Sequence, residues 1–166
     1  MTDLTTNMPA GSLHRRAGIA ALAVLAMTAV HHVYGAVIYD TPFRLHIVFV
    51  AVPVALFIAF ALRLGAARAG TKQGRMATWA AVAVTLVFAV AAIGVFEGGY
   101  NHFVKNIAYL GGGEAAVRMM MPSWLYDPAA VEIPNDVVFE ATGIAQFPLS
   151  IWAAIETWRL ARRTAG

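Results

Sequence analysis

The sequence predicts an all-α membrane protein built as a four-helix transmembrane bundle. Three observations lead to this fold class: a very apolar composition, four long apolar runs, and the absence of polar/apolar alternation within them. Residues of the set AVILMFWYC make up 60% of the chain and charged residues 13%, and the mean hydropathy is +0.66. Soluble domains contain about 45–50% apolar and about 25% charged residues. A soluble chain of 166 residues has too little interior to bury so much apolar surface.

Four apolar runs predict the helices, at residues 17–39, 43–64, 76–98 and 137–158. Each run has about 20–23 residues, which is enough to cross a hydrocarbon core of about 30 Å. Thr41-Pro42 and Asn135-Asp136 are typical helix starts before the second and fourth runs. Membrane-spanning strands would need alternating polarity, which these runs lack. We therefore expect one transmembrane domain at 17–164, after an N-terminal tail at 1–16.

The first run also has features of a secretory signal peptide, because Arg15 and Arg16 precede an apolar stretch. Its apolar part exceeds the usual length of about 7–15 residues, and no small-x-small cleavage motif ends it. We therefore expect the first helix to be retained.

The basic residues predict the orientation of the bundle, because positively charged loops stay in the cytoplasm. Nine of them fall on one side of the predicted membrane: Arg15, Arg16, Arg63, Arg68, Lys72, Arg75, Arg159, Arg162 and Arg163. The three on the other side are Arg44, Lys105 and Arg118. Both termini are thus expected in the cytoplasm, with the chain in the plasma (inner) membrane. The long connection at about residues 100–134 would then face outward, with a short helical extension at about 101–109 followed by a structured loop.

Charge placement and the lack of cysteine exclude several classes of function. The net charge is +3, but the basic residues lie in short clusters beside apolar runs, so no nucleic-acid partner is expected. A chain with no cysteine has no disulfides, thiolate metal sites or thiol catalysis. The expected partner is the lipid bilayer. Abundant Gly and Ala in the first and third helices would also allow close packing in a homodimer or a larger membrane complex.

Six polar residues gather near the predicted outer ends of the helices, and every helix contributes at least one. They are His31, His32, His46, Glu97, His102 and Glu140. Ionisable side chains at this depth are costly and normally face the interior of a bundle, where they mark functional sites. Imidazole and carboxylate groups together suit a transition metal, and bundles build such sites from facing helices. The sequence therefore predicts a metal site at this level.

Four further residues are expected to support or orient the ligands: Tyr34, Arg44, Asn101 and Lys105. If the site is catalytic, Glu97 and Glu140 are the candidates for a ligand or general base in redox or hydrolytic chemistry on a small molecule. The Glu-x-x-His spacing of di-iron bundles is absent, since Glu97 and His102 are five residues apart.

Three other interpretations remain open from the sequence. A haem-binding electron carrier would use His31 or His32 with His46 or His102 as axial ligands. An accessory subunit or small transport component would use the same residues for proton or cation coupling. A membrane anchor would have no site, and its polar residues would only form hydrogen bonds between helices.

Overall fold

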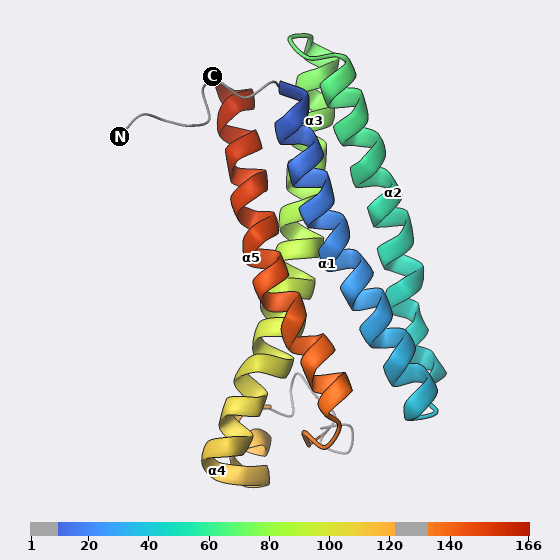
Figure 1. Ribbon diagram of the computed structural model, residues 1–166, viewed down its shortest axis with the longest axis vertical. Helices are drawn as coiled ribbons and strands as arrows, with labels where there is room; N and C mark the ends of the chain where they lie inside the picture. Colours follow the sequence, from blue (N-terminus) through green and yellow to red (C-terminus); the bar gives the residue numbers. More distant parts are fainter. Residues whose placement is uncertain (1–9, 122–132) are drawn as a thin grey trace.

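The computed structural model describes residues 10–121 and 133–166, and within these ranges the chain is helical without any strand. The elements in order are α1 (Ala10–Ile38), η1 (Pro42–Leu45), α2 (His46–Ala67), α3 (Lys72–Val84), η2 (Thr85–Val104), α4 (Lys105–Met120) and α5 (Val137–Ala165). α3, η2 and α4 follow one another without a break, so they form one long rod. Figure 1 shows this rod between α1, α2 and α5, with the start of α1, the start of α3 and the end of α5 at the same end of the bundle.

Four of these helical segments are long and apolar enough to cross a membrane, which agrees with the number predicted from the sequence. Their bounds are Gly11–Ile38, Pro42–Ala67, Lys72–Met120 and Val137–Ala165. The first helix begins earlier than expected, because residues 10–16 continue the helix instead of ending a tail.

The third helix also differs from its predicted bounds. The helical extension expected at 101–109 is present, but the helix continues through the expected loop as far as Met120, and residues 122–132 lie outside the described part. No proline interrupts this stretch before Pro122, so nothing removes a backbone N–H from the helix. Only at Gly113 does the backbone leave the helical region, with φ 64° and ψ −155°, and glycine tolerates that conformation.

The long rod is not a uniform α-helix. η2, from Thr85 to Val104, is a π-helix, in which each turn is wider than in α3 and α4. Small residues let this segment lie against α5: a Cβ on Gly98 would come within 2.7 Å of the Phe147 backbone nitrogen, and one on Gly94 would collide with Ser150. Bulky side chains are therefore excluded from the contact between η2 and α5.

The bundle carries apolar side chains outside and a row of polar ones inside. Large exposed apolar residues include Phe49, Leu56 and Phe60 on α2. The apolar core is built mostly from alanine with a few larger side chains, such as Leu13, Val24, Ile58 and Leu160. Buried polar side chains lie on every long helix except α2, and most of those near the η1 end meet in one place.

Candidate metal centre

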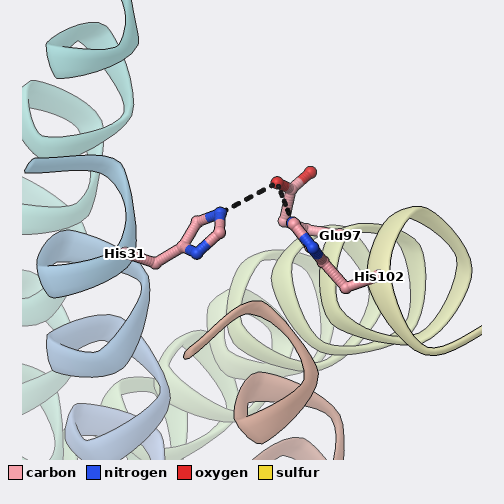
Figure 2. A group of neighbouring side chains, drawn as sticks. All are labelled: His31, Glu97 and His102. Atoms are coloured by element: carbon pink, nitrogen blue, oxygen red, sulfur yellow. Dashed lines mark ion pairs between the residues drawn. The ribbon is translucent and has the colours of Figure 1, made fainter. Parts of the chain in front are cut away.

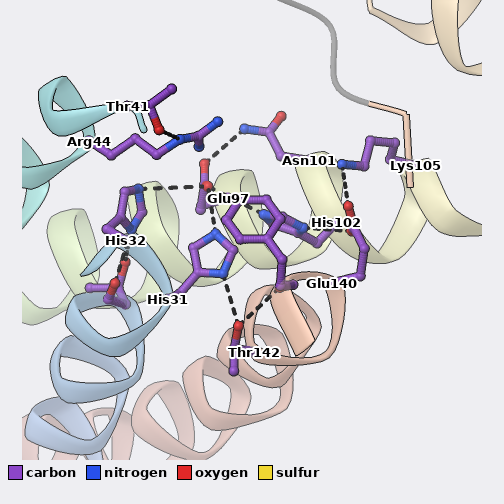
Figure 3. A network of polar contacts seen from close by, with 12 residues as sticks. His31, His32, Thr41, Arg44, Glu97, Asn101, His102, Lys105, Glu140 and Thr142 are labelled. Atoms are coloured by element: carbon purple, nitrogen blue, oxygen red, sulfur yellow. Dashed lines mark hydrogen bonds and ion pairs between the residues drawn. The ribbon is translucent and has the colours of Figure 1, made fainter. Parts of the chain in front are cut away.

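Three separate helical segments send polar side chains to one point in the bundle (Figure 3). α1 contributes His31 and His32, η2 contributes Glu97, Asn101 and His102, and α5 contributes Glu140 and Thr142. The three histidines are almost fully buried, with exposed fractions of 0%, 7% and 2% for His31, His32 and His102. Of the six candidate ligands expected from the sequence, five therefore come together here.

The π-helical geometry of η2 explains how Glu97 and His102 share one face. His102 is five positions after Glu97, and the backbone hydrogen bonds of a π-helix join residues i and i+5. Nε2 of His102 lies 3.5 Å from Oε1 of Glu97. Asn101 also reaches the same carboxylate, because its Nδ2 donates to Oε2 of Glu97 at 2.9 Å. Residues five positions apart are therefore in contact here.

His32 has a defined tautomer. Its Nδ1 lies 2.9 Å from the backbone carbonyl oxygen of Thr28, one turn earlier in α1. A carbonyl can only accept, so Nδ1 carries the proton and donates it. The neutral ring then presents the lone pair of Nε2, which lies 3.9 Å from Oε1 of Glu97.

His31 is held in the same way from α5. Its Nδ1 lies 3.1 Å from Oγ1 of Thr142. When the Thr142 hydroxyl donates its own proton to the Val138 carbonyl at 2.8 Å, its oxygen accepts from Nδ1 of His31. The lone pair of Nε2 then faces Oε1 of Glu97 at 3.8 Å, and this nitrogen is buried with no hydrogen-bond partner among the described residues.

His102 is oriented by a carboxylate. Its Nδ1 lies 2.8 Å from Oε2 of Glu140, and Glu140 also accepts from Nζ of Lys105 at 2.8 Å. Nδ2 of Asn106 donates to the same Oε2 at 2.6 Å. A carboxylate that binds the second ring nitrogen fixes the orientation of a histidine and makes Nε2 a stronger base. Glu140 therefore orients the His102 ring from the side opposite Glu97.

Glu97 is the point on which the three imidazoles converge. Figure 2 shows its carboxylate between the rings of His31 and His102. The ligand atoms of His31, Glu97 and His102 all lie within 4.8 Å of one another. Ligand atoms around a tetrahedral metal ion at about 2.0–2.1 Å would be about 3.3–3.4 Å apart. The observed separations of 3.5–3.9 Å from the Glu97 oxygen need only a small contraction to match.

Close packing fixes the histidine rings. The Phe139 ring stacks on His31 with centroids 4.2 Å apart and an interplanar angle of 26°. Gly35 makes room for Phe139, since a Cβ there would lie 2.6 Å from its Cε2 atom. Gly143 makes room for His102, because a Cβ at this position would collide with the imidazole. The rings therefore have little freedom to turn away from Glu97.

Three residues expected at the site lie beside it or apart from it. His46 is exposed, and its Nδ1 contacts the Phe43 carbonyl oxygen at 2.6 Å, so it is not part of the cluster. The Arg44 guanidinium lies 5.2 Å from the centroid of the Phe139 ring, above the site (Figure 3). Tyr34 donates its hydroxyl proton to Oδ2 of Asp136 at 3.0 Å and so links α1 to the start of α5.

Asp136 is the cap of α5 and lies outside the candidate membrane spans. It accepts hydrogen bonds from the backbone N–H groups of Val138 and Phe139 at 2.9 and 3.0 Å. The hydrogen bond from Phe139, followed by that from Tyr34, lowers the pKa of the Asp136 carboxyl below its ordinary value. This cap sets the first turn of α5, from which Phe139 and Glu140 reach the cluster.

Four residues that orient the ligands were not predicted from the sequence: Thr28, Asn106, Phe139 and Gly143. A local signal existed for two of them: Thr28 lies four residues before His32, and Asn106 lies four residues after His102. Such i, i+4 spacing brings side chains onto one helix face. Phe139 and Gly143 act across helices, so no spacing within the chain could reveal them.

Comparison with known proteins assigns the chain to no family. No protein-family model matches the chain, and neither a curated protein nor a solved structure is similar to it. The site itself is therefore the evidence for function.

Proposed function

We propose that this chain is a multi-pass membrane protein that holds one transition-metal ion between His31, His102 and Glu97. His32 is the nearest further donor. The observation that carries this proposal is Nε2 of His31, a buried ring nitrogen with no hydrogen-bond partner among the described residues. In the tautomer protonated at Nδ1, its lone pair faces a carboxylate oxygen at 3.8 Å, and a cation between the two atoms would make this arrangement favourable.

The hydrogen bonds around the cluster support a metal over a simple polar contact. Each Nδ1 is engaged by an acceptor, so each Nε2 is available as a ligand. Metal-binding histidines typically donate the second ring N–H to a carboxylate, a backbone carbonyl or another oxygen. Here one histidine uses a carboxylate, one a carbonyl and one a hydroxyl.

The distribution of polarity supports the membrane location. Phe49, Phe60 and Leu110 are 75%, 66% and 85% exposed, whereas His31 and Lys105 are 0% and 3% exposed. Ionisable groups inside a membrane face the interior of the bundle and pair there, while apolar side chains face lipid. The proposed orientation, with the cluster toward the outer face, follows from the basic residues at the opposite end.

The ligand set favours Zn²⁺, Cu²⁺, Fe²⁺ or Mn²⁺, because imidazole nitrogen and carboxylate oxygen bind all four. Three protein ligands leave a fourth position for water or a small substrate, as in catalytic metal sites. If His32 takes that position instead, the site is closed and its role is structural. The number of histidines that the metal needs therefore separates a reactive centre from a structural one.

Haem is a poorer fit to the cluster. Axial imidazoles bind on opposite faces of the macrocycle, with the porphyrin between them. The His31 and His102 rings instead touch edge to face, with centroids 4.6 Å apart and an interplanar angle of 82°. A porphyrin between these two rings would require the helices to separate.

Elemental analysis of the detergent-purified protein tests the proposal. We expect about one metal ion per chain, lost in His31→Ala and Glu97→Gln. His46→Ala is the matched control, because it removes an exposed histidine outside the cluster and should keep the metal. If His32→Ala also keeps it, the ion needs only three protein ligands and has an open position.

Two outcomes would contradict the metal centre: a protein that stays metal-free after incubation with each candidate ion, or metal that His31→Ala and His46→Ala retain equally. Coupling of protons through the histidines and carboxylates would then be the better explanation for the cluster.

A further inference from the structure

The opposite end of the bundle contains a second polar feature, which the metal centre does not use. A cavity of about 340 Å³ lies where α1, α2, α3 and α5 meet. Its lining includes His14, Arg75, Thr78, Arg163 and Thr164. Figure 1 shows this end of the bundle, at the start of α1 and α3 and the end of α5.

A second cavity of about 500 Å³ adjoins the first and shares Arg75, Thr164 and Ala165 with it. Lys72 adds another basic side chain here, while Met76 and Trp79 form an apolar flank. These two apolar side chains are 62% and 44% exposed on the outer face of α3. Lys72, Arg75 and Arg163 are themselves exposed, so the joined cavities place a basic surface beside an apolar one.

Lys72, Arg75 and Arg163 are not engaged by other side chains in the described part of the chain. Among residues 10–121 and 133–166, no hydrogen bond or ion pair involves the side chains of Lys72, Arg75 or Arg163. Nearby Arg16 and Arg159, by contrast, both contact Oε1 of the buried Glu156 at 2.7 Å. Among the described residues, no Asp or Glu side chain lines either cavity. Three basic side chains there thus have no acidic side chain to balance them.

We propose that the joined cavities bind the phosphate headgroup of an anionic phospholipid. Arg75 and Arg163 hold the phosphate, and Met76 and Trp79 contact the upper part of the acyl chains. Basic pockets between transmembrane helices on the cytoplasmic side are suited to anionic headgroups. Arginine is favoured for this role because its planar guanidinium can donate two hydrogen bonds to one phosphate. The inference rests on the membrane location in the proposed function but not on the metal.

Thermal unfolding with added lipid tests this site on the full chain in detergent. Phosphatidylglycerol should raise the melting temperature of the wild type above that measured with phosphatidylcholine of the same acyl chains. Arg163→Gln and Arg75→Gln should each weaken the apparent affinity for phosphatidylglycerol by about fivefold. Arg162→Gln is the matched control, because Arg162 is exposed on the same helix end and lines neither cavity.

Inorganic phosphate forms the second arm of the experiment. If phosphate alone reproduces the shift given by phosphatidylglycerol, the ligand is a soluble phosphate and the lipid assignment is wrong. Equal losses in Arg163→Gln and Arg162→Gln would also overturn the site, because general attraction to a basic helix end would then explain the effect.

Metal content measured on the same preparations keeps the two proposals separate. Arg163→Gln should lose the lipid response and keep its metal, whereas His31→Ala should lose its metal and keep the lipid response.

Discussion

At His31, the direction of one hydrogen bond decides what the opposite ring nitrogen can do. When Thr142 gives its hydroxyl proton to a backbone carbonyl, its oxygen accepts from Nδ1. Nε2 is therefore unprotonated in the neutral ring and faces Glu97. The two other histidines of the cluster follow the same rule with different acceptors, so the chemistry of the site depends on residues that never touch the ion.

Thr142→Val tests this dependence with a side chain of nearly the same shape. Without the acceptor for Nδ1, His31 loses its fixed tautomer and orientation, and metal affinity should fall by about 10–100-fold. Competition with a chelator of known affinity measures the change. Thr157→Val is the control, since the Thr157 hydroxyl is also buried in α5 but has no hydrogen-bond partner in the described structure. Affinity that Thr142→Val leaves unchanged would rule out this orienting role.

Glu140→Gln tests the buried ion pair behind His102. The substitution leaves the Lys105 ammonium, with a side chain only 4% exposed, without a counter-charge. Loss of one partner from a buried pair costs about 3–5 kcal/mol of unfolding free energy, and denaturant unfolding should detect it. Glu114→Gln is the control, because its pair with Arg118 is 56% and 49% exposed and contributes less than about 1 kcal/mol.

A double variant separates stability from metal binding at the same position. Glu140→Gln/Lys105→Met removes both charges, so much of the lost stability should return. Metal affinity should stay low, because His102 still lacks its carboxylate. Full recovery of both properties would mean that Glu140 serves only to neutralise Lys105.

Among the elements, η2 and α5 form the contact on which the cluster depends. The wide turn of η2 places Glu97 and His102 on one face, and glycines on both segments let the backbones approach. Gly143→Ala should therefore displace the His102 ring and abolish metal binding, as measured by elemental analysis. Gly111→Ala is the control, since no atom lies within 4 Å of the added Cβ. It should keep the metal and leave stability equal or slightly higher. Metal retained in Gly143→Ala would show that the ring position is not critical.

The Asp136 cap at the start of α5 makes the stability of the folded chain depend on pH. Because the folded state lowers the pKa of Asp136, its stabilising effect is present at neutral pH and is lost as the pH falls through that lowered value. Asp136→Asn should reduce the difference in melting temperature between neutral and acidic pH. Asp40→Asn is a suitable control, because Asp40 has a φ of 49°, which Asn also tolerates. The same pH response in the wild type and both variants would exclude this contribution.

For the whole molecule, the cluster is the place where polar side chains of α1, η2 and α5 meet. A metal bound by His31, Glu97 and His102 ties α1 to η2 and stabilises the folded state by mass action. A chelator should therefore lower the melting temperature of the wild type. At an ion concentration of about 100 times Kd, the stabilisation would be about 2.7 kcal/mol. Glu97→Gln should show no response to the chelator, and a drop of equal size in this variant would assign the effect to another site.

The sequence by itself determined the fold class and the level of the site. Length and hydropathy require helices, because unpaired backbone cannot remain in lipid, and these features predicted the number of spanning segments that the structure contains. Ionisable residues are unfavourable within apolar runs, and their positions predicted most of the cluster, including His31, Glu97 and His102. They could not show that residues 110–120 stay helical, since Gly111–Gly113 also suited a loop.

Tertiary structure decided which candidates meet and what each one does. His46 and His31 look alike in sequence, yet one is exposed and the other is fully buried. Glu97 and Glu140 also look alike, but one faces three imidazoles and the other binds Lys105 and the far side of His102. The physical reason is that the hydropathy pattern indicates how deep a residue lies in the membrane. The direction in which its side chain points depends on the rotation of the helix about its axis. That rotation is set by the π-helical turn of η2 and by the glycine contacts between helices.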